Sequence, residues 1–270
     1  MSICALTKHI EKNQYSYFIA RRSRIQKPLP AMADSKVILA FDAYGTLLST
    51  ESIAKQLAQH FGDSKAATIA KTWRKYQLEY TWRLNSMDHY KDFEYVTRQS
   101  LKHALAESDC KLSDQDISSL MEAYNSLSIF PDVAKTLEQI RSASDIYAVV
   151  FSNGTQRMVS ASVSQSPDLK SYGDVFQDIV TVEEVKKYKP APEVYHHLAR
   201  AVGMEQRTDR IWLVSGNPFD VVGARQAGFN AIWVNRSSDR GWEDALVDSE
   251  TGRPTVVVRS LDQVVDTVLG

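Results

Sequence analysis

An acidic residue follows an apolar run near the start of the chain, at a place where a buried strand would end. The run is residues 37–41, the acid is Asp42, and Gly45 and Thr46 follow within four residues. A carboxylate in such a place can attack an sp3 carbon and form an ester, but an Asp after a strand can also simply cap the next turn. Asp42 alone therefore does not decide between catalysis and structure, and the bulky Tyr44 beside it also needs a reason.

Further side chains that could do chemistry follow later apolar runs. Ser152 and Asn153 follow one run, Lys189 lies in the loop after a weaker one, and Ser215 follows another. The runs are residues 37–41, 146–151, 175–182, 211–214, 231–234 and 255–258. Continuous apolar strands separated by helix-length segments predict a parallel sheet covered on both faces. Because the carboxyl ends of such strands share one edge, we expect these polar side chains to converge on one crevice.

About 80 residues without a strand signal separate the first run from the second. Residues 65–87 are rich in long side chains and contain no Pro or Gly, which predicts a long helix. Residues 95–108 and 113–127 predict two more helices, with Ser113 as an N-cap. We therefore expect a helical cap over residues 51–129, inserted into an α/β core of residues 34–50 and 130–270. Farther along, residues 162–173 are expected to form a surface turn region.

The composition is that of an ordinary soluble protein. Hydrophobic residues make up 43% and charged residues 24% of the chain. The formal net charge of −1 gives no electrostatic reason to expect nucleic acid or an anionic membrane as a partner. The two cysteines, Cys4 and Cys110, form no disulfide framework and no metal-ligand spacing, which suits a reducing compartment. We expect a cytoplasmic protein without a membrane span.

The first 33 residues are expected to lie outside the fold, as a basic extension. Residues 1–31 contain one acid, Glu11, and these six basic residues: Lys8, Lys12, Arg21, Arg22, Arg24 and Lys27. An Arg-rich, acid-poor N-terminus is typical of a mitochondrial transit peptide. The alternatives are a disordered extension, or translation that starts at Met32.

The wider pattern around the polar residues is more specific than any one of them. Asp-x-x-Gly-Thr at residues 42–46 is followed by Ser-Asn-Gly about 110 residues later, then by Lys-Pro, then by an acid after another strand. This order resembles the haloacid dehalogenase superfamily. The stretches FDAYGTL, WRKYQLEYTW, FSNG, YKPAPEVY and VSGNPFD are similar to its L-2-haloacid dehalogenase (haloacid dehalogenase type II) family. The resemblance implies a Rossmann-like doubly wound parallel sheet with an inserted all-helical cap subdomain.

Tyr44 separates two branches of that superfamily. Its phosphatases have a second Asp at this position as a general acid, and they hold magnesium between the first acid and a later acidic motif. Tyr is a poor proton donor and a poor magnesium ligand at neutral pH, and the later motif SGNPFD supplies one acid, Asp220. The resemblance therefore implies no metal and no cofactor. A phosphatase or other ester hydrolase of the superfamily, and a non-catalytic binding relative, are the alternatives.

The resemblance also implies a reaction and a set of roles. Short (S)-2-haloalkanoic acids would be hydrolysed to (R)-2-hydroxy acids through an ester on Asp42, with Lys189 pairing with that carboxylate. Thr46 would orient Asp42, while Ser215, Asn217 and Asp220 would position and activate the water, with Tyr195 in the same network. Arg74 and Asn153 would receive the halide, and Ser152 the substrate carboxylate. Tyr44, Leu78, Phe93 and Phe219 would form an apolar wall.

Two positions depart from the family pattern, and both border the expected pocket. Lys75 stands where a neutral amide is expected, and Phe219 stands where Trp is common. Substrate size and rate depend on them, whereas the reaction type does not.

The expected partner is a small 2-halo carboxylic acid, and a homodimer is possible by analogy with relatives.

Overall fold

A computed structural model describes residues 36–237, 241–247 and 249–270. The expected basic extension over residues 1–33, and with it the targeting hypothesis, falls outside this part of the chain. Within the described ranges, no helix is long and apolar enough to cross a membrane.

Six parallel strands form one sheet with the order β3-β2-β1-β4-β5-β6. The strands are β1 (Val37–Asp42), β2 (Ile146–Ser152), β3 (Asp178–Thr181), β4 (Ile211–Ser215), β5 (Asn230–Val234) and β6 (Val256–Val258). Strand β1 is central, with Phe41 level with Val214 on one side and Asp42 level with Phe151 on the other. Five of its six residues are buried, as expected for an apolar strand covered on both faces.

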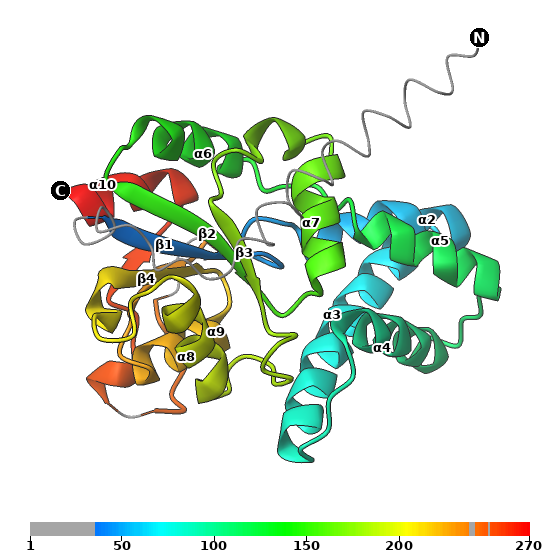
Figure 1. Cartoon of the computed structure of the whole chain (residues 1–270). Helices are drawn as coiled ribbons and strands as arrows, with labels where there is room; N and C mark the ends of the chain where they lie inside the picture. The colour runs from blue at the N-terminus through cyan, green and yellow to red at the C-terminus, as the bar shows by residue number, and fades with distance from the viewer. Residues whose placement is uncertain (1–35, 238–240, 248) are drawn as a thin grey trace, which may run out of the picture. The chain divides into compact units, whose positions relative to one another are not determined.

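Helices cover both faces of the sheet (Figure 1). Helices α6 (Val133–Ser142) and α10 (Val264–Leu269) lie on one face, and α8 (Pro192–Ala201) and α9 (Pro218–Gln226) lie on the other. Helix α6 shows why: its buried residues recur at helical spacing and form one stripe, namely Val133, Thr136, Leu137 and Ile140. The α/β fold with a doubly wound parallel sheet is thus confirmed.

One expectation in the core is wrong. Residues 162–165 are the last turn of α7 (Gln156–Gln165), not part of a surface turn. Thr155 caps this helix by accepting a hydrogen bond from the Met158 amide, and Ser162 and Val163 are buried on its inner face. The short helical turn Lys170–Tyr172 follows.

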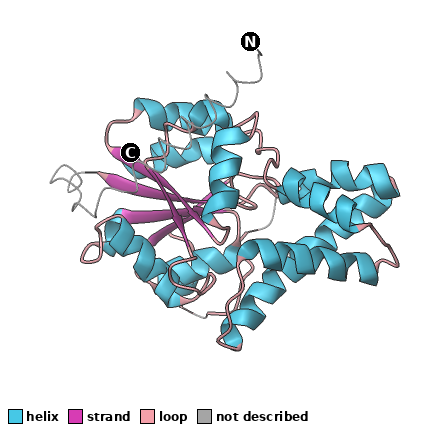
Figure 2. Cartoon of the chain, turned by 45° about the vertical axis from the view of Figure 1, so that its right-hand side comes forward, coloured by secondary structure: helices cyan, strands magenta, loops and turns pink. Residues whose placement is uncertain are grey.

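Four helices lie in the chain between β1 and α6, and they pack together beyond the carboxyl ends of the strands (Figures 1 and 2). They are α2 (Ala54–Phe61), α3 (Asp63–Ser86), α4 (Phe93–Glu107) and α5 (Asp114–Tyr124). Helix α3 is the longest, with 24 residues. Ser113 caps α5 in a reciprocal capping box with Asp116, as its sequence indicated. Three of the helices were expected, and α2 was not.

The two connections between this helical segment and the sheet run side by side. Leu48 and Ile129 form an antiparallel bridge. The Ser49 amide donates to the Ser128 carbonyl at 2.8 Å, and the Phe130 amide donates to the Leu47 carbonyl at 3.2 Å. The segment therefore leaves and re-enters the core at one place, directly after the loop that carries Thr46.

An ion pair fixes that place to the end of the sheet. Arg236, which follows β5, donates from Nε and Nη2 to the two carboxylate oxygens of Asp132, each at 2.9 Å. It also donates to the Thr46 carbonyl at 2.9 Å, and its guanidinium lies 3.9 Å from the Phe130 ring centroid. Asp132 in turn accepts the Leu261 amide at 2.9 Å. The Arg236–Asp132 pair thus connects the loop after β1, the return from the helical segment and the last strands.

Replacing Asp132 with Ala should destabilise the protein by about 2 kcal/mol, because it leaves Arg236 and the Leu261 amide without their acceptor. Urea unfolding followed by circular dichroism measures the loss. Asp262→Ala is the matched control, since its partner Lys135 is exposed, and it should cost much less. Equal losses in the two variants would show that the Arg236 contacts do not stabilise this junction.

Candidate active site

Asp42 lies at the point where the strand order of the sheet reverses. From β1 the chain continues to β2 and β3 on one side of the sheet and then to β4, β5 and β6 on the other. In an open parallel sheet the loops on either side of this switch point separate and leave a crevice at the carboxyl ends of the strands. Asp42 is the last residue of β1, and Asn217 follows neighbouring strand β4, so both belong to this crevice.

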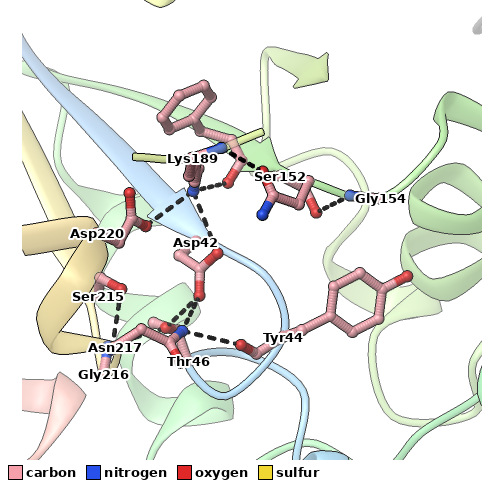
Figure 3. Close-up of polar contacts among 12 residues, drawn as sticks. Asp42, Tyr44, Thr46, Ser152, Gly154, Lys189, Ser215, Gly216, Asn217 and Asp220 are labelled. Carbon is pink, nitrogen blue, oxygen red and sulfur yellow. Dashed lines mark hydrogen bonds and ion pairs between the residues drawn. The ribbon is translucent and has the colours of Figure 1, made fainter. Parts of the chain in front are cut away.

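Three donors hold the Asp42 carboxylate (Figure 3). The Lys189 ammonium lies 3.2 Å from Oδ1, while the Thr46 hydroxyl and the Asn217 side-chain amide each donate to Oδ2 at 2.8 Å. The whole Asp42 residue is 6% exposed. Its orientation is therefore fixed through both oxygens.

The Lys189 ammonium also serves a second carboxylate. It lies 2.8 Å from Oδ2 of Asp220 and donates to the Phe151 carbonyl at 2.8 Å. Tyr195 donates to Oδ1 of Asp220 at 2.8 Å. Burial raises the pKa of Asp220, and the Lys189 ammonium opposes that rise. One cation thus sits between two carboxylates in a nearly dry interior, where leaving any of the three without its partner would be costly.

Three glycines permit these approaches. Gly45 turns the chain after Asp42 with φ +91°, a conformation in which L side chains are strained. A Cβ atom on Gly216 would lie 2.6 Å from the Gly45 carbonyl oxygen, so the loops after β1 and β4 touch because both residues are glycine. A Cβ atom on Gly223 would lie 2.3 Å from the Tyr195 hydroxyl, so Tyr195 reaches Asp220 over a helix that leaves room for it.

These carboxylates do not fit a magnesium site. Each of their four oxygens already accepts a hydrogen bond from Lys189, Thr46, Asn217 or Tyr195. Magnesium requires several oxygen ligands in near-octahedral geometry, and Tyr44 stands where a further acid would be. Within the residues that the structure describes, no group of three or more His, Cys, Asp or Glu side chains could hold a metal ion.

Arg74 reaches this crevice from α3. Its Nη2 donates to the Tyr44 carbonyl at 3.1 Å and to Oδ1 of Asn217 at 3.3 Å. Its Nη1 donates to the Gln77 side chain at 2.7 Å. All three acceptors are neutral, and among the described residues Arg74 has no ion pair. The guanidinium is therefore held in place with its charge uncompensated, which is an arrangement that favours an anion.

Ser152 and Asn153 follow β2 on the other side of Asp42. The Ser152 hydroxyl accepts the Gly154 amide at 3.0 Å and is fully buried. Oδ1 of Asn153 accepts a hydrogen bond from the Lys189 backbone amide at 3.0 Å, so the Nδ2 group of Asn153 points away from that backbone amide. No hydrogen bond to the described residues uses that Nδ2 group. Ser215 is buried, and its hydroxyl accepts the Asn217 backbone amide at 3.1 Å.

Two of the four residues of the expected apolar wall are in contact with each other. Tyr44 and Phe93 are buried with ring centroids 5.4 Å apart. Burial raises the pKa of Tyr44 far above its usual value. The Ser162 hydroxyl lies near the phenol but donates to backbone carbonyls, and the Tyr44 hydroxyl makes no hydrogen bond of ordinary geometry to the described residues. Leu78 lies one turn beyond Arg74 on α3 and is half-buried. Phe219 is also half-buried, and its ring meets Trp82 of α3 at 5.5 Å rather than Tyr44 or Phe93.

Four side chains around the site were not singled out from the sequence. Gln77, Thr97 and Tyr124 belong to the hydrogen-bond network at Arg74, and Trp82 packs against Phe219. Gln77 and Trp82 lie within the stretch WRKYQLEYTW, and Gln77 follows Arg74 by three residues, which places both on one helix face. That spacing was a usable signal. Thr97 and Tyr124 come from α4 and α5, and no local pattern connects them to Arg74.

Comparison with known proteins supplies an independent view. The family model of haloacid dehalogenase-like hydrolases matches residues 37–228. An (S)-2-haloacid dehalogenase from Burkholderia cepacia is 35% identical over 77% of this chain and 87% of its own length. Another, from Pseudomonas putida, is 31% identical over 86% of this chain and 97% of its own.

Solved structures agree with the sequence comparison. The L-2-haloacid dehalogenase from Xanthobacter autotrophicus with chloropropionic acid covalently bound is 26% identical. It superposes with a TM-score of 0.76 and covers 87% of this chain and 99% of that one. The resemblance to this family is thereby confirmed. The chain belongs to the haloacid dehalogenase-like hydrolases and, within them, to the family of the (S)-2-haloacid dehalogenases.

Proposed function

We propose that this protein hydrolyses short (S)-2-haloalkanoic acids to (R)-2-hydroxy acids and halide. The observation that carries the proposal is a buried, oriented carboxylate, Asp42, beside a guanidinium, Arg74, that is held by neutral acceptors and keeps its charge for an anion. The matched relatives are (S)-2-haloacid dehalogenases, and chloropropionic acid is covalently bound in one solved structure of this family, which supports an ester intermediate.

In the first step, an oxygen of Asp42 attacks C2 of the substrate from the side opposite the halogen. The new C–O bond forms as the carbon–halogen bond breaks, the configuration inverts, and the halide leaves with both bonding electrons. Arg74 and the Nδ2 group of Asn153 receive it. Holding nucleophile and carbon in line supplies roughly 7–11 kcal/mol of the barrier. Halide departs without a proton, so this step needs no general acid at position 44.

In the second step, water attacks the ester carbonyl of Asp42. The C–O bond between the carbonyl carbon and the Asp42 oxygen that attacked C2 breaks, the 2-hydroxy acid leaves with that oxygen, and one water oxygen stays in Asp42. Ser215 and Asn217 position the water, and Asp220 takes one of its protons, which then passes to the departing alkoxide oxygen. The other proton is released as the Asp42 carboxylate is regenerated. Asp220 suits this role because burial raises its pKa, while Lys189 and Tyr195 hold its oxygens. Thr46 keeps the carboxylate oriented in both steps.

The remaining roles complete the proposal. Ser152 and the backbone amides after Asp42 bind the substrate carboxylate, and Tyr44, Leu78, Phe93 and Phe219 enclose its alkyl group.

Residues 51–129 act as the cap over a core of residues 34–50 and 130–270. The protein acts in the cytoplasm without metal or cofactor, or in the mitochondrion if residues 1–31 are a transit peptide, and it forms a homodimer.

Halide release from (S)-2-chloropropionate in the presence of EDTA is the direct test. The natural chain should release chloride and form (R)-lactate, and Asp42→Asn should release none above background, because an amide does not attack carbon. In single-turnover reactions in ¹⁸O-labelled water with enzyme in excess, label should enter Asp42, which mass spectrometry of the peptide detects.

The same preparation separates the alternative functions. Magnesium-dependent turnover of an aryl phosphate without halide release would identify a phosphatase. A folded chain that neither turns over any halo acid nor incorporates label into Asp42 would be a binding relative. Either result overturns the proposal.

Tyr44→Phe tests whether position 44 supplies a proton. The phenol is buried without a hydrogen-bond partner among the described residues, so removing it should stabilise the protein by about 1 kcal/mol. The kcat/KM for 2-chloropropionate should stay within about threefold, since the ring still packs against Phe93. Tyr44→Ala, which removes the ring, should lower kcat/KM strongly. A loss of about a hundredfold in the Phe variant would instead assign the hydroxyl to the chemistry.

A further inference from the structure

We infer that Gln77 is a positioning residue that fixes the Arg74 guanidinium while leaving its positive charge available. The inference deepens the proposed function and rests on it. Gln77 lies on α3, three residues after Arg74, and is 1% exposed. Its Oε1 accepts from Nη1 of Arg74 at 2.7 Å, the shortest of the three contacts that hold the guanidinium.

The Gln77 amide is held in one orientation from both ends. Its Nε2 donates to the Thr97 hydroxyl at 2.8 Å, and that hydroxyl uses its own proton to reach the Phe93 carbonyl at 2.6 Å. Thr97 therefore accepts from Gln77, and the Nε2 end must face it. At the other end, Tyr124 donates to Oε1 at 3.1 Å, and burial raises the pKa of Tyr124, so the phenol keeps its proton. A flipped amide would set its N–H group against the Arg74 guanidinium and its oxygen against the oxygen of the Thr97 hydroxyl.

The neutrality of Gln77 matters as much as its position. A guanidinium has five N–H groups, and three hydrogen bonds to neutral oxygens leave the others for a ligand. A carboxylate at position 77 would make the same contact but would pair with the charge. In a partly dry site such a pair is far stronger than in water, so Arg74 would lose much of its attraction for an incoming anion. The amide orients the cation without neutralising it.

This arrangement also ties Arg74 to the packing of the helical segment. Gln77 and Arg74 come from α3, Thr97 comes from α4, and Tyr124 comes from α5. The Trp73 indole donates to the Thr97 carbonyl at 2.8 Å, and its ring packs on Tyr124 at 5.1 Å. The guanidinium is therefore in its place only when the three helices are assembled around the amide.

Two substitutions at Gln77 separate position from charge. Gln77→Glu keeps the shape and adds a charge, whereas Gln77→Met keeps the volume and removes the acceptor. Both should lower kcat for 2-chloropropionate by about tenfold or more, with a smaller change in KM, because the charge that Arg74 meets develops as halide leaves. The kcat loss should be larger for the chloro than for the bromo substrate, since the better leaving group depends less on an anion site. A residue needed only for folding would affect both substrates equally.

Thr97 supplies the matched controls. Thr97→Val removes the acceptor that fixes the amide and should reproduce part of the Gln77→Met effect, including its dependence on the halogen. Thr97→Ser keeps the hydroxyl and should restore activity to within about threefold of the natural chain. Equal activity in the Val and Ser variants, or equal losses on chloro and bromo substrates at Gln77, would overturn the inference.

A stability measurement distinguishes failure of this inference from failure of the proposed function. In a double-mutant cycle of Gln77→Met and Arg74→Met, the unfolding midpoints should be non-additive, because the contact exists only when Gln77 and Arg74 are both present. The cycle needs no turnover. Additive midpoints would refute the Gln77–Arg74 contact, whereas coupled midpoints in a chain that releases no halide would refute the proposed reaction alone.

Discussion

The site depends on one ammonium that compensates two carboxylates away from water. Lys189 is 1% exposed, and Asp42 and Asp220 are 6% and 0% exposed, so each charge relies on the others and on a few neutral donors and acceptors. Such a set is expensive to bury and stable only when every partner is in place. The Phe151 carbonyl, the Tyr195 hydroxyl and the Asn217 amide supply those partners. This requirement explains why loops from three strands must touch, why Gly45 and Gly216 lie where two of them meet, and why Gly223 lies where α9 makes room for Tyr195.

The helical segment and the sheet contribute different parts of the site. The strand ends and loops of the sheet supply two carboxylates and one lysine, whose ammonium pairs with both of them. Helix α3 supplies the second cation, which binds carbonyl and amide oxygens of the core and pairs with no acid in the described residues. In the proposed reaction, the anion-binding charge comes from the segment beyond the sheet, and the nucleophile comes from the sheet itself. A substrate that carries an electrophilic carbon between two anionic or electronegative ends fits between the Asp42 carboxylate and the Arg74 guanidinium.

Much of the fold follows from local signals, because continuous apolar runs identify buried strands and Ser113 identifies a helix start. The polar residues at the strand ends were also found, since parallel strands bring their carboxyl ends together. The failures have physical reasons. The Ser-rich end of α7 has weak helix propensity, and tertiary packing of Ser162 and Val163 overrides it. Thr97 and Tyr124 act on Arg74 across three helices, and a contact of this kind leaves no periodic trace in the sequence.

The bridge between Leu48 and Ile129 has a consequence for how such proteins diversify. The two ends of the helical segment lie side by side at the end of the sheet. A tight turn would therefore connect the same two positions as these roughly eighty residues do. Insertions, deletions or replacement of the whole segment can then accumulate without shifting the register of any strand. A lineage built this way can keep its nucleophile and lysine constant while it exchanges the part that selects the leaving group. This connection allows a new substrate to be acquired by substitution of a module, without redesign of the fold.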